Sequence, residues 1–297
     1  MSAAPSRRAV AGMLLGTGAF AVNDIFLKIV ADELPATQIL CLRSLLATAL
    51  LGGLAVALGQ ARSLAAAARP LVLVRGTMEL FCAVLFVSAL PFVPIGNLTA
   101  IAQMAPLIIT LLGALVLGEI VGWRRWTAVG MGLAGGILIA GPAEGGVNLY
   151  TLLALGVPVM VAVRDLIARR IGTDIGVLPM TFSLSAVVAA GTALGAFAGD
   201  WVVPSGGALL MIGAACLLAL FGHAAVLTAV RESDLSSIAP LYYVQTVWAG
   251  LAGLAVFGEV PGLAAIAGIA LVIGAGLYTL RRQRLHQQAE TPPPVVA

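Results

Sequence analysis

The chain has 297 residues, of which 61% are hydrophobic and 10% are charged, and its formal net charge is +3 with a pI near 9.0. A soluble domain carries about 25% charged residues, so this composition excludes an ordinary soluble protein and indicates a chain solvated mostly by lipid. The connections between the apolar segments are too short to fold as a soluble domain. The placement of the basic residues in loops explains the high pI without a nucleic-acid partner.

Ten apolar segments are long enough to cross a bilayer, which takes roughly 20 apolar residues. They run over 9–30, 37–58, 70–90, 96–117, 122–140, 149–170, 177–198, 206–229, 236–257 and 261–280. The predicted fold class is therefore an all-α polytopic membrane protein with ten transmembrane helices. The lipid bilayer is its first expected partner.

The first apolar segment also fits a second interpretation. Basic residues precede it and small residues follow its apolar run, which is the pattern of a cleavable secretion signal. Against this, Asp24 and Lys28 of the first segment recur as Asp165 and Arg169 in the sixth. Cleavage would leave the sixth span without its counterpart, so we interpret the first segment as a mature span.

The basic residues gather on alternate loops. Those expected on one side of the membrane, with the adjoining span ends, are Arg7, Arg8, Arg62, Arg69, Arg124, Arg125, Arg169, Arg170, Arg231, Arg281, Arg282 and Arg284. The connections expected on the other side contain neither Lys nor Arg and lie near 31–36, 91–95, 141–148, 199–205 and 258–260. By the positive-inside rule, both termini are predicted to be cytoplasmic, in a bacterial inner membrane.

The segment 97–119 recurs 140 positions further on as 237–259, and both copies end in Gly-Glu. We expect the two glutamates, Glu119 and Glu259, to cap or tether turns rather than to contact a solute. The repeated unit contains five spans. Because five is odd, the second copy enters the membrane from the opposite side, as in inverted-repeat transporters. The predicted organisation is a first five-helix repeat over 9–140, a second over 149–280, and a basic, disordered tail over 281–297.

Ionisable groups inside a bilayer cost a few kcal/mol each unless they are paired or face water, so they are the first candidates for function. Counting about 1.5 Å per residue from the span ends places Asp24, Lys28 and Arg43 in an outer layer. Asp24 and Arg43 lie at similar depth on neighbouring antiparallel spans and could pair. The three residues form either a permanent ion pair that fixes a hairpin, or an outer gate or substrate clamp.

An inner layer contains Arg75, Glu79, Arg164 and Asp165, with His223 on the eighth span. Arg75 and Glu79 are four residues apart on one helical face, so they could form a local pair. Otherwise Glu79 serves a cavity as a proton acceptor or as a ligand for a cationic group. His223 could titrate near neutral pH or pack as a hydrogen-bonded residue.

The repeated segment also supplies uncharged candidates near the midplane. Pro106 removes a backbone hydrogen bond in the fourth span, and Pro240 does the same at the start of the ninth. Broken helices that carry amide and phenol groups can hold a small polar solute. The predicted lining residues are Gln103, Tyr242, Tyr243 and Gln245.

Several enzyme classes lack their motifs in this sequence. Lys28 is the only lysine and no Gly-Lys phosphate loop surrounds it, so the chain contains no ATP motor. HExxH, GxSxG and metal-ligand spacings are absent. Cys41, Cys82 and Cys216 lie singly within spans, as small packing residues do. We expect no catalytic residue, no metal and no cofactor.

Ten spans, a five-plus-five duplication and the pattern Pro-Leu followed by Leu-Gly-Glu (106–107 and 117–119) resemble the drug/metabolite transporter superfamily, specifically its EamA-domain members. The likeness covers the chain to about residue 280. Asn23-Asp24 with Lys28, Arg75-Gly76, and Ala239-Pro240 with Tyr243 are similar to bacterial S-adenosylmethionine carriers, and riboflavin carriers are similar as well. The resemblance implies a central cavity lined by spans one to four and six to nine, with spans five and ten peripheral.

We therefore predict a secondary transporter that moves a small polar organic metabolite, an amino acid or a related compound, by alternating access, with proton coupling as one option. The alternative is an intramembrane enzyme or lipid-modifying protein that uses Glu79 and His223. The sequence leaves the oligomeric state open between a monomer and a weak dimer, and it leaves uptake and export equally open.

Overall fold

The structure is a computed structural model that describes residues 6–116, 118, 122–141, 148–168, 170–171, 175–199, 201–232 and 239–290. All regular secondary structure in these ranges is helical. The α-helices are α1 (Arg7–Val30), α2 (Ala36–Ala57), α3 (Pro70–Ala89), α4 (Ile95–Ala102), α5 (Ala105–Val116), α6 (Trp123–Ile139), α7 (Leu149–Ala168), α8 (Val177–Ala198), α9 (Gly206–Glu232), α11 (Val244–Ala252) and α12 (Leu263–Glu290). Short 3₁₀ helices η1 (Ala61–Ala68) and η2 (Ala239–Tyr243) and a π-helical turn η3 (Gly253–Phe257) complete the elements.

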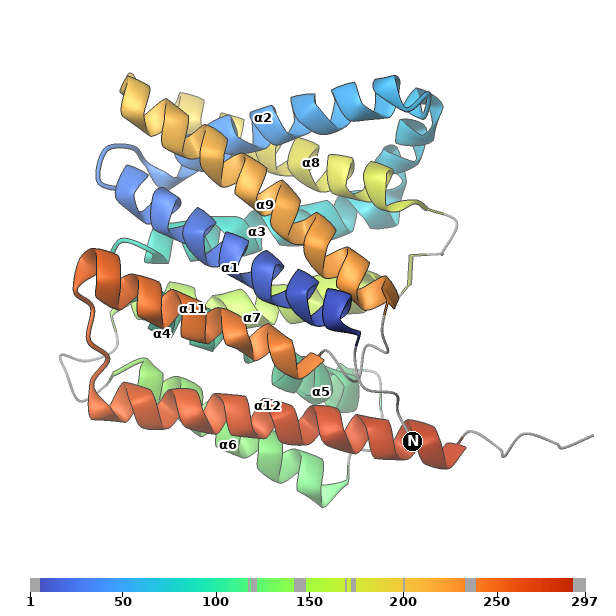
Figure 1. The fold of residues 1–297 in the computed structure, drawn as a ribbon, viewed down its shortest axis with the longest axis vertical. Helices are drawn as coiled ribbons and strands as arrows, with labels where there is room; N and C mark the ends of the chain where they lie inside the picture. Colours follow the sequence, from blue (N-terminus) through green and yellow to red (C-terminus); the bar gives the residue numbers. More distant parts are fainter. Residues whose placement is uncertain are drawn as a thin grey trace, which may run out of the picture.

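The long helices lie side by side in one bundle, and their ends gather at two opposite sides (Figure 1). The side on the left of Figure 1 contains the end of α1, the start of α2 and the turn before α12, and we name it the Lys28 end. The side on the right contains η1 and the start of α3, and we name it the Arg75 end.

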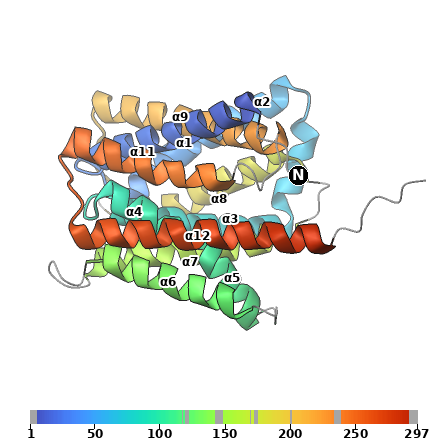
Figure 2. The same ribbon diagram turned by 60° about the horizontal axis from the view of Figure 1, so that its bottom comes forward.

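Close helix pairs build the bundle: α1 packs with α9, α2 with α8, α3 with α7, and α6 with α12. Small residues allow these approaches, because a Cβ atom at Gly16 would lie 3.0 Å from the carbonyl oxygen of Gly222, and one at Gly135 would lie 2.8 Å from that of Gly268. Helices α6 and α12 lie together at one edge of the bundle in both views (Figures 1 and 2). The remaining helices therefore surround the centre.

Within the described residues, eight helices are long and apolar enough to cross a membrane, where the sequence predicts ten. One of the eight combines α4 and α5 over Ile95–Val116. The predicted fifth span is α6, with 17 residues, and the predicted tenth has its apolar part at Leu263–Thr279. Seventeen residues reach about 26 Å, slightly less than a hydrocarbon core. The structure supports an all-helical, multi-pass membrane protein.

Two spans are interrupted where the sequence places prolines. Helix α4 ends at Ala102 and α5 begins at Ala105, with Pro106 as its second residue. A proline there has no N–H to donate to the preceding turn, so the chain passes through a turn between the two helices. In the ninth span, Pro240 lies in η2 and regular α-helix begins only at Val244.

The predicted disorder of the tail is wrong for its first part. Helix α12 continues from the apolar segment through the basic residues to Glu290. The stretch 281–290 contains mainly Arg, Gln, Leu, Ala and Glu, which are good helix formers, so it extends a helix that has already been nucleated. Residues 291–297 lie outside the described ranges.

The main hydrophobic core lies towards the Lys28 end. Its fully buried side chains include Leu27, Leu90, Ile95 and Leu98, which stand at or near the helix ends on that side. Two much smaller buried clusters lie towards the Arg75 end, around Met13 and around Val72. The described bundle is therefore packed more densely at the Lys28 end.

Candidate functional site

Lys28 joins segments from both halves of the chain. Its Nζ atom donates to the backbone carbonyl of Val93 at 3.0 Å and forms an ion pair with Glu259. The other carboxylate oxygen of Glu259 accepts a hydrogen bond from the backbone N–H of Ile95 at 2.8 Å. The Lys28 ammonium also lies 5.2 Å from the ring centroid of Phe257, a cation–π distance. We name these five residues the Lys28 network.

Local geometry explains how Glu259 reaches this position. Gly258 has φ +67°, a left-handed conformation that favours glycine, and it ends the π-helical turn so that Glu259 folds back. Gly253 leaves room for the carboxylate, because a Cβ atom there would lie 2.8 Å from Glu259 Oε2. The carboxylate then caps the start of α4, where backbone N–H groups are free and the helix dipole favours negative charge. The expectation that Glu259 tethers a turn is confirmed, whereas Glu119 lies outside the described residues.

A second set of hydrogen bonds ties the Lys28 end. The Gln38 amide donates to the carbonyl of Val202 at 2.5 Å and accepts from its N–H at 3.2 Å. The Glu33 carboxylate accepts from the N–H and the hydroxyl of Ser205, at 2.6 and 2.8 Å. Together they connect the α1–α2 turn and the first turn of α2 to the segment before α9. The Lys28 end is thus closed by contacts between residues more than 160 positions apart in sequence.

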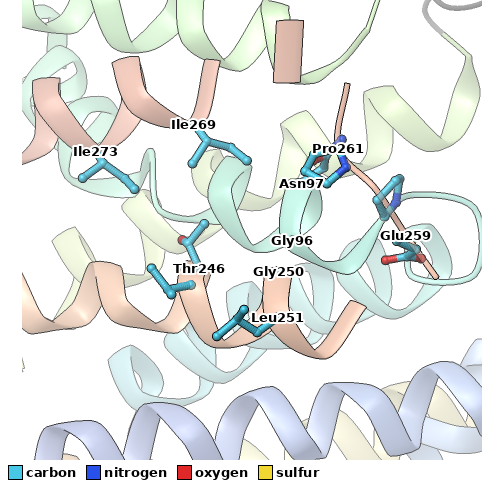
Figure 3. A pocket seen from close by; sticks show the side chains of 11 residues that line it. Gly96, Asn97, Thr246, Gly250, Leu251, Glu259, Pro261, Ile269 and Ile273 are labelled. Carbon is cyan, nitrogen blue, oxygen red and sulfur yellow. The ribbon is translucent and has the colours of Figure 1, made fainter. Parts of the chain in front are cut away.

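A lateral pocket lies beside the Lys28 network, between α4, α11 and α12 (Figure 3). Gly96 and Gly250 lie against each other at its base, where a Cβ atom on Gly96 would lie 3.0 Å from the Gly250 Cα atom. The walls are mostly apolar and include Ile269 and Ile273, with Thr246 and Asn97 as polar members. At the base of this pocket, α4 and α11 therefore cross closely.

The predicted outer pair between Asp24 and Arg43 does not form a salt bridge in the structure. Asp24 is 7% exposed, and its carboxylate accepts a hydrogen bond from the Asn23 side chain at 2.8 Å. Among the described residues, no Lys or Arg nitrogen lies within 4.0 Å of the Asp24 carboxylate. Lys28, one turn along α1, pairs with Glu259 instead. The three predicted outer-layer residues therefore have three different environments.

In the inner layer, Arg164 is the residue that joins the others. Its Nη1 atom lies 2.7 Å from the Glu79 carboxylate, and its Nε atom lies 2.9 Å from the carboxylate of its neighbour Asp165. The expected local pair between Arg75 and Glu79 is replaced by this contact between α3 and α7. Within the described residues, Arg75 Nε is buried without a hydrogen-bond partner. We name Arg75, Glu79, Arg164 and Asp165 the Arg164 cluster.

A central pocket opens between α2, α3, α8 and α9, and it is lined by charged and polar groups from all four helices. They include Arg43 and Ser44 from α2, Glu79 from α3, Ser185 from α8, and Cys216 and His223 from α9. No described carboxylate lies within 4.0 Å of the Arg43 guanidinium. The pocket is therefore lined by Arg43, which has no described salt-bridge partner, and by Glu79, which is paired with Arg164.

His223 has the hydrogen-bonded packing that the sequence gives as one of its two options. Its Nδ1 atom lies 2.7 Å from the carbonyl oxygen of Ala219, and its ring meets the Phe20 ring edge to face with centroids 4.8 Å apart. These contacts are those of a packed histidine. The side chain also lines the central pocket, so the ring can contact a solute there.

The predicted midplane residues divide between two environments. Gln103, at the break between α4 and α5, donates to the carbonyl oxygen of Tyr242 at 2.8 Å and so links the two interrupted spans. The Tyr242 side chain packs beside the buried cluster around Met13. Tyr243 is buried and directs its hydroxyl against Gly276 of α12. Gln245 is half-buried on α11.

Sequence reasoning missed the partners rather than the charged residues themselves. Arg164 is named in the inner layer, but its pairing with Glu79 depends on the packing of α3 against α7. The carbonyl of Val93 and the N–H of Ile95 carry no signal in side-chain chemistry. The one available signal was Pro94, which lies between them in sequence and precedes the start of α4. The first N–H groups of a helix have no partner within the helix and are free for an outside acceptor.

Comparison with known families identifies the class of protein. Residues 7–141 match the EamA-like transporter family. The resemblance to EamA-domain proteins is therefore confirmed for the first half of the chain, and its long apolar helices support a multi-pass membrane protein.

Characterised relatives extend the likeness over most of the chain. An S-adenosylmethionine uptake transporter of Rickettsia prowazekii is 24% identical over 275 residues, which are 91% of this chain and 92% of that protein. A pseudopaline exporter of Pseudomonas aeruginosa is 26% identical over 91% of this chain and 95% of that protein. A riboflavin transporter of Rhizobium johnstonii is 28% identical over 67% of this chain and 66% of that protein.

A solved crystal structure shares the fold. It superposes with a TM-score of 0.62 at 22% sequence identity, over 93% of this chain and 98% of the other. The arrangement of helices described above thus occurs in an experimentally determined protein.

Proposed function

We propose that this protein is a secondary transporter that carries a small polar organic metabolite across the bacterial inner membrane by alternating access. The observation that supports this most is the central pocket, which brings Arg43, Glu79 and His223 from three helices to one cavity inside an apolar bundle. Charged groups are retained within a membrane where they serve a solute or an ion. The relatives are transporters by name, although they carry different solutes and work in both directions.

The proposal includes the architecture predicted from the sequence. Two five-helix repeats, 9–140 and 149–280, would lie inverted with respect to each other, with both termini cytoplasmic. Helix pairs that join the two halves, such as α1 with α9 and α3 with α7, are what such a duplication produces. In this orientation the Lys28 end faces outwards, and its closure makes the described conformation closed to the outside.

The solute that suits the pocket is an amino acid or a compound that contains an amino-acid group. Arg43 offers a guanidinium, which binds a carboxylate with two parallel hydrogen bonds. Ser44 beside Arg43, Ser185 on α8 and His223 on α9 add polar partners around the same pocket. Glu79 lines the same pocket, and its carboxylate would bind the cationic group of the solute in competition with Arg164. The solute would therefore be zwitterionic.

A flux assay tests this function. The purified protein in sealed proteoliposomes is given a panel of labelled amino acids, S-adenosylmethionine and riboflavin, with the solute loaded on either side. We expect protein-dependent flux of at least one carboxylate-bearing solute, and Arg43→Gln should slow it about tenfold or more, the cost of one charge-assisted contact of ~1.5–3 kcal/mol. The matched control is Arg62→Gln, an exposed position on η1 outside the pocket.

The same experiment separates transport from intramembrane catalysis by Glu79 and His223. An enzyme would convert its substrate in detergent solution, where no compartments exist, whereas a carrier returns the solute chemically unchanged. Conversion of a panel member in detergent, together with no flux in vesicles, would contradict the transporter.

A further inference from the structure

Asp24 is the buried acid whose environment sets it apart from the other acids of the described membrane helices. It lies on α1 at 7% exposure, and the amide of Asn23 is the hydrogen-bond partner of its carboxylate. Glu79 has Arg164 at 2.7 Å, and Glu259 has Lys28 and the N–H of Ile95. A carboxylate in an apolar interior without a salt-bridge partner is stabilised when it binds a proton.

Charged and titratable groups lie on α1 and on helices that pack against it. On its own helix, Lys28 is one turn away but is engaged by Glu259. From α2, the charge of Arg43 acts on Asp24 from beyond salt-bridge distance. From α9, His223 packs on Phe20, one turn before Asp24 on α1. Helix α11, which also packs on α1, contains no Asp, Glu, Lys, Arg or His over Val244–Ala252.

The side chain next to Asp24 is also incompletely partnered. Asn23 uses its amide nitrogen to donate to Asp24, while its Oδ1 atom is buried without a hydrogen-bond partner among the described residues. A buried acceptor left without a donor costs about as much as a lost hydrogen bond. A carboxylic acid, unlike a carboxylate, brings a hydroxyl that can donate to an oxygen of this kind.

Arg43 connects this acid to the central pocket. It lines the pocket together with Glu79 and His223, and it is the cation whose field reaches Asp24. While the pocket is empty, the positive charge of Arg43 would favour the ionised form of Asp24. When a solute carboxylate binds Arg43, the positive charge is neutralised by the solute, and Asp24 loses the interaction that favours its ionised form.

We propose that Asp24 is the proton-binding residue of this carrier and that Arg43 links its protonation to the binding of a solute carboxylate. The inference rests on the proposed transport function and extends it. Proton and solute anion would bind together, because each reduces the free energy of binding the other, and linkage requires the effect to be equal in both directions. The carrier is then a symporter, and an inward proton gradient drives uptake. Glu79, the acid that the sequence favours for this role, is instead held by Arg164.

The first test needs no solute. Infrared spectroscopy of the purified protein detects the carbonyl stretch of a protonated carboxylic acid, which is recorded while pH is varied over the range in which the protein stays folded. We expect a titrating band in the wild-type protein and in Glu79→Gln, and its loss in Asp24→Asn. In Arg43→Gln the band should persist to higher pH, because the cation that favours ionised Asp24 is gone. A band that survives in Asp24→Asn, or that disappears only in Glu79→Gln, overturns the proposal.

The second test uses flux in proteoliposomes with the panel described above. A one-unit inward pH gradient should drive about tenfold accumulation by the wild-type carrier for one proton per solute. Asp24→Asn mimics the neutral acid, so it should still exchange solute across the membrane but lose accumulation driven by the gradient. Gradient-driven accumulation that persists in Asp24→Asn, or accumulation that follows a sodium gradient instead, refutes the proton role of Asp24. A wild-type protein that moves no panel member speaks against the transport function, whereas the infrared test judges Asp24 separately.

Discussion

The Lys28 network and the Arg164 cluster are both groups of charges within the helix bundle, but they are held in different ways. In the Lys28 network, backbone atoms of Val93 and Ile95 take part, so the ion pair is tied to a helix start and a turn. In the Arg164 cluster, all partners are side chains on two helices, and Arg75 keeps an unpartnered Nε within the described residues. The Lys28 network ties side chains to the backbone and so closes the Lys28 end. The Arg164 cluster is held by side chains alone, and these can change partners beside the central pocket.

The difference predicts that Arg164 is the most sensitive position of either group. Replacing it with alanine leaves the Glu79 and Asp165 carboxylates without their salt-bridge partner. Breaking a buried ion pair in this way costs about 3–5 kcal/mol, and partial exposure of these side chains places the loss at the lower end. We expect a large drop in thermal stability in detergent and a loss of flux.

A double substitution checks that the cause is electrostatic. Removing the Glu79 charge as well, in Arg164→Ala with Glu79→Gln, should recover a substantial part of the stability, because one stranded carboxylate is gone. If the double variant is as unstable as the sum of the two single variants, packing rather than charge pairing explains the loss.

Breaking the Lys28 network should change conformation more than stability. In Glu259→Gln the side chain can still accept from Ile95 N–H, but the ion pair with Lys28 is lost. If the pair contributes about 1.4 kcal/mol to the closed state, the open population rises tenfold. Cys216 lines the central pocket, so a membrane-impermeant thiol reagent added from the Lys28 side reports opening once Cys41 and Cys82 are replaced. The labelling rate should rise by about that factor.

Glu33 offers the matched control for this experiment. It also links distant segments at the Lys28 end, but its contacts with Ser205 are exposed, and exposed contacts contribute less than buried ones. Glu33→Gln should change the labelling rate by less than about twofold. Equal effects from Glu33 and Glu259 would show that closure does not depend on the Lys28 network.

Two turn glycines, Gly258 and Gly59, allow a smaller test of the role of the Lys28 network. Gly258 and Gly59 have nearly the same left-handed φ, +67° and +66°, and neither has an atom within 4 Å of an added Cβ. Alanine at either position should cost about 1–2 kcal/mol through backbone strain. Only Gly258 positions Glu259, so Gly258→Ala should also raise Cys216 labelling, whereas Gly59→Ala should lower the melting temperature alone.

The contrast between these regions also explains what the sequence could predict. Apolar length and proline placement are local signals, and they locate the helices and the breaks at Gln103 and before Val244 correctly. The depth of charged residues is nearly local, and Glu79, Arg164 and Asp165, which the sequence places in one layer, do contact one another through Arg164. Partner choice is not local. Whether Lys28 pairs with Asp24 or with Glu259 depends on how α1 meets a turn 231 residues away, and no periodicity records that contact.

Tyr243 shows the same limitation, and it provides the smallest predicted effect. Its repeat position favours a role at the midplane, but its hydroxyl is buried against Gly276 and has no hydrogen-bond partner among the described residues. Removing an unpaired buried hydroxyl costs nothing and relieves a desolvation penalty of about 1 kcal/mol. Tyr243→Phe should therefore keep wild-type flux and melt at the same or a slightly higher temperature.

Glycine 276 provides the reciprocal check on that packing. A Cβ atom at this position would collide with the Tyr243 ring, so Gly276→Ala should destabilise the wild-type protein. Truncation of the ring in Tyr243→Ala should relieve part of that clash, which a double-mutant cycle on the melting temperature would measure. Independent effects of the two substitutions, or a loss of flux in Tyr243→Phe without a loss of stability, would return Tyr243 to the solute pathway. The interpretation that it only anchors the ninth span to α12 would then be wrong.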